Sequence, residues 1–275
     1  MAMLSIVMPV YNTRLEQLER SVRSLLNQTY KELEILLVDD GSGEETKEKL
    51  KELAALDPRI HLIRQENAGA SAARNTGIRA ARGRYLTMMD SDDSIAPEAY
   101  EEAIRKLQKS GADVAVFGFR EMAADGTTTD RPAIKGSRIA LENPKNILAI
   151  IAVSANQRGG GYPWNKVWDL ERIGKAELFE EGIFCYEDKL WCIQMYQKCR
   201  KVLLLPENYY TYYENTQSLS RGDSISKEEA VKKRRSALQA YERIREVLPQ
   251  KSVAHCAATL FWVKTIVAGV VKKTL

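Results

Sequence analysis

The chain has 275 residues and an ordinary globular composition, with 44% hydrophobic and 28% charged residues. This length allows one large domain or two small ones with a sizeable core, and four cysteines are too few for a disulfide framework. The formal net charge of +4 is unevenly distributed: residues 221–275 carry 12 Lys and Arg against 5 Asp and Glu, whereas residues 1–220 carry 29 against 32. The asymmetry indicates an anionic partner, either a membrane surface or a nucleic acid.

The first 120 residues alternate short β-type runs with helical patterns. Runs rich in Ile, Val, Leu or aromatic residues predict strands at 5–10, 34–38, 60–64, 85–89 and 113–119. Helices are expected behind two capping-box patterns, at 13–16 and 42–45, and between Pro97 and Gly111. Such alternation implies a mostly parallel sheet covered by helices, an α/β fold.

The alternation stops after residue 120. Gly, Pro, Ser and Thr at 125–137 and three glycines at 159–161 predict loops around a short helix at 144–153. The elements expected further along are a helix at 188–196, a strand at 202–205, an aromatic run at 209–213, and two C-terminal helices at 227–247 and 252–271.

Acidic residues follow two of the expected strands. Open α/β sheets bind ligands beyond the carboxyl ends of their strands, and Asp39, Asp40 and Asp90–Asp93 stand at such ends. Carboxylates gathered there would repel one another unless a cation offsets them, and Mg²⁺ or Mn²⁺ holding a diphosphate would do so. An isolated Asp-x-Asp more often caps a helix, but the company of Asp39, Asp40 and Arg74 favours the metal site.

Several other chemistries lack their motifs. No G-x-G-x-x-G follows the first strand, and no G-x-x-x-x-G-K-[ST] occurs, which argues against dinucleotide-binding oxidoreductases and P-loop enzymes. His61 and His255 are the only histidines, the first inside a strand pattern and the second in a C-terminal helix pattern, so imidazole chemistry and a zinc site have little support. A general base is therefore expected to be a carboxylate.

Four motifs in order resemble the N-terminal half of family 2 glycosyltransferases of the GT-A fold. They are Pro-Val-Tyr-Asn at 9–12, Val-Asp-Asp-Gly-Ser at 38–42, Asn-Ala-Gly at 67–69 with Ala-Arg-Asn-x-Gly at 73–77, and Asp-Ser-Asp-Asp at 90–93. Trp-Asn-Lys at 164–166, Glu-Asp at 187–188 and Gln-Ser-Leu-Ser at 217–220 resemble the bacterial members. The resemblance implies a GT-A catalytic domain over 1–222, with a nucleotide-binding half (1–120) and an acceptor-side half (121–222), followed by basic helices over 223–275.

The resemblance also implies a mechanism. The donor would be a nucleotide-diphosphate sugar, most often a UDP-sugar, and Mn²⁺ or Mg²⁺ would bridge its phosphates and neutralise the departing diphosphate. The residues expected to contact the nucleotide are Pro9, Tyr11, Asp39, Asp40, Arg74 and Asp90, with Asp40 preferred over Asp39 for the base; Asp92 and Asp93 would bind the metal. Asp188 would be the catalytic base, and one base with in-line displacement predicts inversion of the anomeric carbon.

The acceptor side of the site leaves alternatives open. Trp164, Lys166 and Glu187 are candidates for contacting the acceptor. Aromatic residues such as Trp164 more often pack in the core, a lone lysine is by default on the surface, and Glu187 with Asp188 could merely begin a helix.

The basic tail has two open interpretations. The fifteen residues 257–271, apolar apart from Thr259, Lys264, Thr265 and Gly269, would span about 22 Å as a helix, too short for a ~30 Å bilayer core. Residues 227–275 could lie on an anionic leaflet, or pack on the catalytic domain or on a second copy in a homo-oligomer. The rest of the sequence gives no support to nucleic acid as a partner, and we expect a cytoplasmic protein, peripheral at the inner face of the membrane if the tail binds lipid.

Without the Gln-x-x-Arg-Trp motif of processive synthases, the resemblance implies a bacterial hexosyl- or N-acetylhexosaminyltransferase that transfers one sugar per encounter. Its acceptor would be a lipid-linked or surface-polysaccharide precursor, an assignment by analogy. The alternatives are a nucleotidyltransferase and a catalytically silent family member that serves as a partner subunit.

Overall fold

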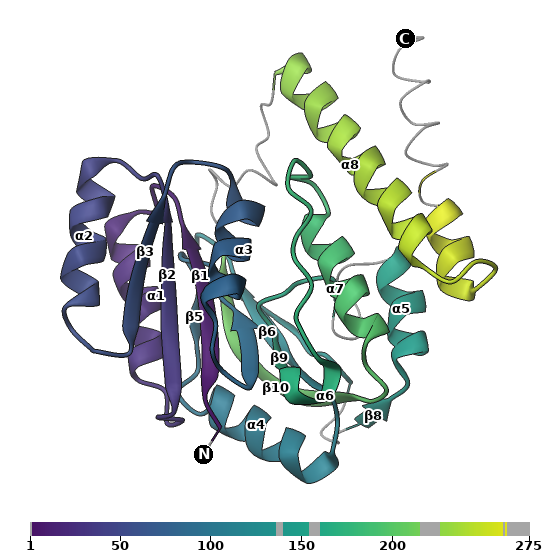
Figure 1. The fold of residues 1–275 in the computed structure, drawn as a ribbon, viewed down its shortest axis with the longest axis horizontal. Coiled ribbons are helices and arrows are strands. Elements are labelled where there is room, and N and C mark those ends of the chain that lie inside the picture. The colour runs from purple at the N-terminus through teal and green to yellow at the C-terminus, as the bar shows by residue number, and fades with distance from the viewer. Residues whose placement is uncertain (1, 136–139, 154–159, 215–225, 261, 263–275) are drawn as a thin grey trace.

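The computed structural model describes residues 2–135, 140–153, 160–214, 226–260 and 262 (Figure 1). A ten-stranded sheet runs through the molecule in the order β3-β2-β1-β4-β9-β6-β10-β5, with β7 paired to β6 and β8 paired to β10. Helices cover both faces of this sheet. The α/β class predicted from the sequence is therefore confirmed.

The first half of the chain forms the parallel part of the sheet. Its elements are β1 (Leu4–Val10), α1 (Leu15–Leu26), β2 (Leu33–Asp40), α2 (Glu44–Ala54), β3 (Ile60–Gln65), α3 (Ala70–Ala80) and β4 (Tyr85–Met88). β1 pairs in parallel with both β2 and β4, and β2 pairs in parallel with β3. The carboxyl ends of these strands consequently share one edge of the sheet.

The second half of the chain gives the sheet a mixed character. Its elements are β5 (Ser94–Ile95), α4 (Ala99–Ser110), β6 (Val114–Met122), β7 (Thr128–Arg131), β8 (Ala140–Glu142), α5 (Pro144–Val153), β9 (Lys166–Asp169), α6 (Leu170–Ile173), α7 (Glu187–Gln197), β10 (Val202–Tyr213) and α8 (Lys227–Val247). β9 lies antiparallel between β4 and β6, while β6 and β10 are parallel. Residues 253–260 form a further helical segment.

Three local predictions are wrong. The segment 125–137 contains β7 as well as a turn, and the aromatic run at 209–213 continues β10 instead of following it. Neither predicted capping box forms: the first residues outside α1 and α2 are Arg14 and Gly43, without side-chain caps. The hydroxyl groups expected to cap are used in tertiary contacts, Thr13 with Ser91 and Ser42 with the backbone N–H of Asn12.

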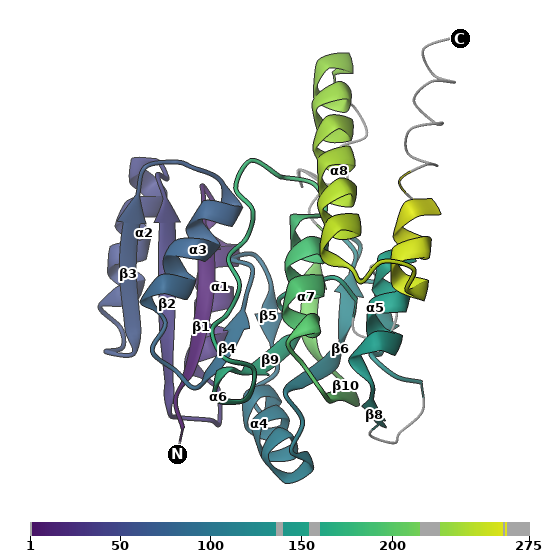
Figure 2. The ribbon, with the colours of Figure 1, turned by 45° about the vertical axis from the view of Figure 1, so that its right-hand side comes forward.

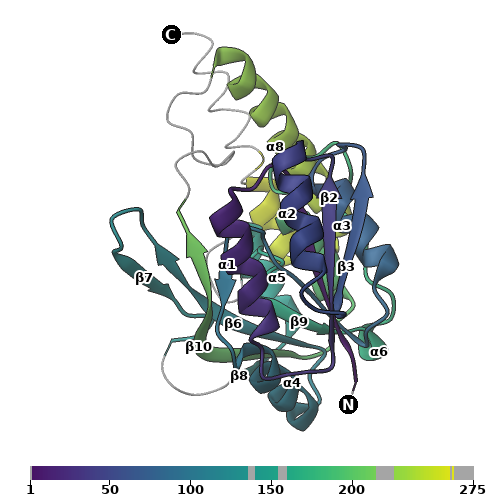
Figure 3. The same ribbon diagram turned by 90° about the vertical axis from the view of Figure 1, so that its left-hand side faces the viewer.

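The core consists of two layers of side chains, one on each face of the sheet. α1, α2 and α4 pack on one face, where Figure 3 shows α1 and α2 side by side. α3, α5, α7 and α8 cover the other face (Figure 2). Gly77 of α3 has no room for a larger side chain, because a Cβ there would lie 2.2 Å from Val7 Cγ1 of β1. This close approach fixes α3, and the residues it carries, against the centre of the sheet.

Helix α8 packs on α7. Its residues Ala240, Tyr241 and Ile244 are buried in the second core layer, as one of the two interpretations of the tail predicts, while its first turns extend past the sheet (Figure 1). No helix of the described residues is both long and apolar enough to cross a bilayer. The end of the helix predicted at 252–271, and the Gln-Ser-Leu-Ser motif, lie outside the described residues.

Candidate active site

Arg74 joins the two halves of the chain. This α3 residue is 5% exposed; its Nη1 donates to Asp188 Oδ1 at 2.9 Å, and its Nη2 donates to Asp90 Oδ1 at 3.3 Å. Glu187 Oε1 lies 3.8 Å from Nη1. Asp90 follows the carboxyl end of β4, whereas Glu187 and Asp188 begin α7. The guanidinium therefore lies among three carboxylates that the sequence predicts for the donor and acceptor sides of one site.

Burial sets the electrostatics of this cluster. The pKa of Asp188 is raised to about 8: burial is the main cause, the negative charges of Glu187 and Asp90 contribute to the rise, and Arg74 opposes it. The pKa of Glu187 is also raised by burial and lowered by Arg74. A quarter of the Asp188 side-chain surface (25%) remains accessible to solvent despite the surrounding protein. An accessible carboxyl with a pKa near neutrality is suited to proton transfer.

Asn75, next to Arg74 on α3, forms hydrogen bonds with the segment that leads to α7. Its Nδ2 donates to the carbonyl oxygen of Phe179 at 3.0 Å and to Glu181 Oε1 at 2.9 Å, and its Oδ1 accepts from the N–H of Phe179 at 2.7 Å. Sequence reasoning placed Asn75 in a motif but gave it no role. Only its position next to a functional arginine could have drawn attention to it.

Asp40 holds a loop beside the strand ends. Its Oδ1 accepts hydrogen bonds from Gln65 Nε2 at 2.8 Å and the N–H of Ala68 at 2.9 Å, and its Oδ2 accepts from the N–H of Gly69 at 2.9 Å. The side chain is buried. This structural role was not predicted from the sequence. A direct contact between Asp40 and a nucleobase stays a prediction.

Asp39 is likewise buried and engaged by protein donors. Its Oδ1 accepts from the N–H of Ser42 at 2.9 Å, and its Oδ2 is paired with Arg64. Tyr11, by contrast, is 55% exposed at the end of β1, one residue beyond Val10, which lies opposite Asp39 in the β1–β2 ladder. Pro9 is partly buried in the same strand. Tyr11 thus offers an open aromatic face at the strand ends.

The two residues predicted as metal ligands differ in their surroundings. Asp93 is completely buried, its Oδ2 accepts from the Tyr210 hydroxyl at 2.7 Å, and its Oδ1 accepts from the N–H of Tyr213 at 3.0 Å. Both oxygens thus bind protein donors, which gives Asp93 a structural role that the sequence did not predict; its role as a metal ligand stays a prediction. Asp92 is partly exposed, and its carbonyl oxygen is held by Arg20 Nη2 at 2.5 Å.

The described residues contain no group of three or more His, Cys, Asp or Glu side chains able to hold a metal. The carboxylate of Asp92, with Asp90 two residues before it, nevertheless fits a hard divalent cation. Mg²⁺ is commonly held by one or two carboxylates and by substrate phosphates, not by an all-protein cage.

Trp164 belongs to the core. It is 4% exposed and stacks between Tyr162 and Tyr210, with ring centroids 4.8 and 4.2 Å away, while Phe119 meets it edge-on at 4.9 Å. The prediction that Trp164 contacts an acceptor is therefore wrong, and the alternative of core packing is confirmed.

Lys166 is completely buried, so the alternative of a surface lysine is wrong. Its ammonium donates to Asn165 Oδ1 at 2.6 Å and to the carbonyl oxygen of Tyr162. Burial lowers the pKa of Lys166 to about 8, while the negative charge of Asp188 raises it. Lys166 thus supports the Asp188 cluster electrostatically from inside the protein, away from the surface that an acceptor would reach.

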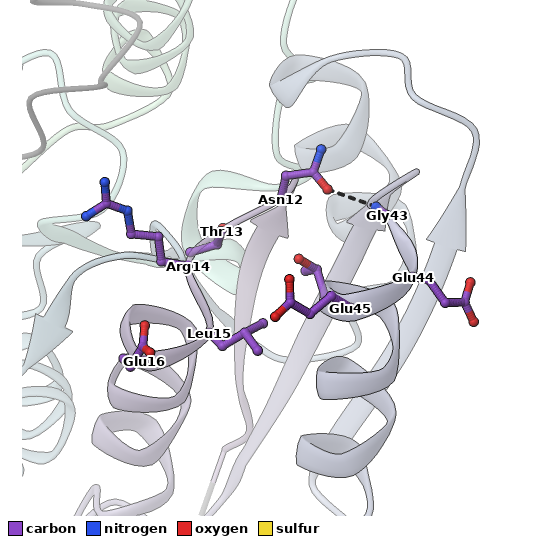
Figure 4. A pocket seen from close by; sticks show the side chains of 9 residues that line it. Asn12, Thr13, Arg14, Leu15, Glu16, Gly43, Glu44 and Glu45 are labelled. Carbon is purple, nitrogen blue, oxygen red and sulfur yellow. Dashed lines mark hydrogen bonds between the residues drawn. The ribbon is translucent and has the colours of Figure 1, made fainter.

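A separate hollow of about 510 Å³ lies at the starts of α1 and α2 (Figure 4). Asn12 Oδ1 accepts a hydrogen bond from the N–H of Gly43 across it, at 2.8 Å. Its lining residues are Asn12–Glu16 and Gly43–Thr46. Because neither Arg74 nor Asp188 lines this hollow, it is not the centre of the proposed chemistry.

The sheet order and the carboxylate-lined strand ends define an α/β protein of the GT-A fold. The S. aureus protein TarS (residues 1–349), solved in complex with UDP-GlcNAc, superposes with a TM-score of 0.72 over 95% of this chain and 71% of that one at 18% identity. The mannosyltransferase PcManGT from Pyrobaculum calidifontis, solved in complex with GDP-Man and Mn²⁺, gives a TM-score of 0.62 over 98% of this chain and 74% of that one at 16% identity.

Sequence comparison gives the family. The family described as "Glycosyl transferase family 2" matches residues 5–158. An uncharacterized glycosyltransferase of Bacillus subtilis, EpsJ, is 32% identical over 219 residues, which cover 79% of this chain and 63% of EpsJ. The chain belongs to glycosyl transferase family 2, and it spans just under two thirds of the length of this relative.

Proposed function

We propose that the chain is a metal-dependent, inverting glycosyltransferase. It would move one hexosyl or N-acetylhexosaminyl unit from a nucleotide-diphosphate sugar, with UDP-sugars as the first candidates, to an acceptor hydroxyl. The observation that carries this proposal is the Arg74 cluster, in which one buried guanidinium contacts Asp90 on the donor side and Asp188 on the acceptor side. UDP-GlcNAc in TarS and GDP-Man in PcManGT support a nucleotide-sugar donor.

The donor nucleotide would lie across the carboxyl ends of β1, β2 and β4. Tyr11 offers an exposed ring against which a base can stack, and Pro9 and Asp39 line the same strand ends. Asp40, which fixes the adjoining loop, would also contact the base. Asp90, held by Arg74, would accept hydrogen bonds from the ribose hydroxyl groups.

Asp92 would hold Mn²⁺ or Mg²⁺ together with the two donor phosphates. The bound ion would act as a Lewis acid that neutralises the charge developing on the departing diphosphate. The Mn²⁺ in PcManGT supports this assignment. Asp93 would serve the same site indirectly, because its bonds to Tyr210 and Tyr213 fix the strand-end turn on which Asp92 lies.

Asp188 would take the proton of the acceptor hydroxyl as the new bond forms. Arg74 lies 2.9 Å from its carboxylate and therefore stabilises the ionised, basic form. Attack assisted by one base, opposite the leaving diphosphate, inverts the anomeric carbon. Glu187, whose side chain is 18% exposed, would contact the acceptor beside it.

The acceptor would be a lipid-linked or surface-polysaccharide precursor met at the inner face of the membrane. Support comes from α8, where Lys232 and Arg235 are exposed and Val231 exposes 66% of its surface. Basic residues near an anionic leaflet contribute about 1 kcal/mol each. Sedimentation with anionic liposomes tests this contact. Liposome binding that is unchanged when Lys232–Arg235 are neutralised would show that these basic residues do not make the contact.

The central test is hydrolysis of a panel of nucleotide sugars with Mn²⁺, Mg²⁺ or EDTA. We expect one UDP-sugar to be hydrolysed in the presence of metal and not with EDTA. Asp188→Asn should bind that donor and fail to turn it over. Asp169→Asn is a matched control, because Asp169 is a buried carboxylate paired with Arg84 at 2.7 Å beside Tyr85, at the opposite edge of the sheet. A wild-type protein that binds no nucleotide sugar in the presence of either metal would refute the proposal.

A further inference from the structure

Helix α8 contacts the short segment that carries the proposed base. The buried hydroxyl of Ser236 accepts hydrogen bonds from two consecutive backbone N–H groups, that of Phe184 at 2.9 Å and that of Cys185 at 3.2 Å. Lys189 Nζ, on the other side of Glu187 and Asp188, donates to the Tyr241 hydroxyl at 3.0 Å. Two residues of α8 therefore hold the chain immediately before and immediately after the two carboxylates.

The start of α7 has little local support of its own. Tyr186, the residue before the helix, has a left-handed φ of 64° and makes no side-chain capping bond. A left-handed conformation is unfavourable for a tyrosine and persists only where surrounding contacts impose it. The Tyr186 ring packs on the Tyr241 ring of α8, with centroids 5.2 Å apart. Contacts from elsewhere in the fold must therefore define the direction in which α7 begins.

Those contacts come from three sides. Asn75 and Arg74 of α3 hold the segment and its carboxylates on one side, and α8 holds them on another. On a third side Gly161 lies against the backbone of Lys189, where a Cβ would come within 3.0 Å of Lys189 Cα. Arg243 of α8 adds a pair of contacts, at 2.8 and 2.9 Å, with Glu180 earlier in the segment.

We infer that α8 positions the proposed catalytic base, with Ser236 and Tyr241 as positioning residues that act through the segment 184–189 on Asp188. This inference deepens the proposed function and rests on it for the identity of the base. It gives helix α8 a part in catalysis that is separate from any contact with a membrane. A shift of about 1 Å in a reacting group can lower a rate by about 10²-fold, so a loosened segment should have a measurable effect.

Ser236→Ala tests the inference directly. We expect kcat for donor hydrolysis to fall at least about tenfold with the donor KM unchanged, because Ser236 bonds to the segment before α7 and not to the residues predicted to bind the donor. The acid limb of the pH profile should move to higher pH as Asp188 moves away from the Arg74 charge. Ser236→Thr keeps the hydroxyl and should restore most of the lost activity. Ser5→Ala is the matched control, because Ser5 is a buried serine that accepts from the N–H of Gly83 at 2.7 Å, at the start of β1.

Hydrogen exchange provides a readout that does not depend on activity. Ser236→Ala should accelerate hydrogen exchange of the backbone amides of 184–189, and Tyr241→Phe should do so to a smaller extent. Ser5→Ala should leave the exchange of these amides unchanged. The inference is wrong if Ser236→Ala lowers the free energy of unfolding by no more than Ser5→Ala does and leaves the kcat, the pH profile and the exchange rates of 184–189 unchanged. If the wild type turns over no nucleotide sugar, the proposed function fails, and exchange alone decides whether α8 holds this segment.

Discussion

Lowering the pH below about 8 should reduce catalysis by protonating Asp188. Burial raises the pKa of this carboxyl to about 8 although Arg74 opposes the change, and a general base must be ionised to accept a proton. Because kcat/KM reports the ionisation of the free enzyme, it should rise about tenfold per pH unit below that value and level off above it.

The same ionisation affects stability in the opposite direction. The ordinary pKa of an aspartate is 3.8, so between that value and about 8 the folded protein binds more protons at Asp188 than the unfolded chain. The stability contributed by the protonated carboxyl is fully present below pH 3.8 and is lost as the pH rises through 8, by at most about 1.4 kcal/mol per pH unit. The Asp188→Asn variant has no ionisable group at this position, so its free energy of unfolding should fall less steeply with rising pH than that of the wild type.

Two measurements together check this reasoning. Donor hydrolysis between pH 5.5 and 9 at constant ionic strength gives the acid limb, and denaturant unfolding of the wild type and Asp188→Asn over the same range gives the difference in stability. Asp169→Asn should retain the wild-type limb. A wild-type kcat/KM that is flat between pH 6 and 8, or a stability difference that does not change with pH, would refute the assignment.

Four other substitutions probe the remaining contacts. Arg74→Lys keeps the charge but cannot bridge two carboxylates, so kcat/KM should fall ten- to about a hundredfold, the equivalent of one charged hydrogen bond of about 1.5–3 kcal/mol, measured by steady-state kinetics. Asn75→Ala removes the hydrogen bonds to the N–H and the carbonyl oxygen of the buried residue Phe179. The free energy of unfolding should fall by about 2–4 kcal/mol in a denaturant titration. Asp92→Asn should abolish the effect of Mn²⁺ on UDP binding in calorimetry, whereas Asp93→Asn should retain it with lower stability.

The parallel part of the fold could be predicted because its signals are local. β1, β2 and β4 are mainly apolar, fully or almost fully buried runs separated by helical patterns, and buried parallel strands have this composition. β9 could not be predicted, because four residues with a lysine and an aspartate at its ends do not look like a buried strand. It forms because the buried side chains of Lys166 and Asp169 find partners in Asn165 and Arg84, which no local pattern reveals.

The residues of the candidate site could be identified more readily than their orientations. The resemblance to family 2 glycosyltransferases implied that Arg74 and Asp188 belong to one site, and the structure joins them by a 2.9 Å hydrogen bond. The pattern Asp-Ser-Asp-Asp could not show which carboxylate faces the core, because the answer depends on Tyr210, 117 residues beyond Asp93. The buried place of Trp164 depends in the same way on distant aromatic residues.

Arg74 makes the three carboxylates of the cluster interdependent. One guanidinium lies within 3.8 Å of Asp90, Glu187 and Asp188, and ionisation of Glu187 changes the free energy of ionising Asp188. The apparent pKa measured from a pH profile therefore belongs to the cluster as a whole. Because Asp90 lies on the proposed donor side, a bound nucleotide that takes up its hydrogen bonds would change the field that Asp188 experiences. Profiles of kcat/KM and of kcat should consequently differ, since the first reports the free cluster and the second reports the cluster with donor bound.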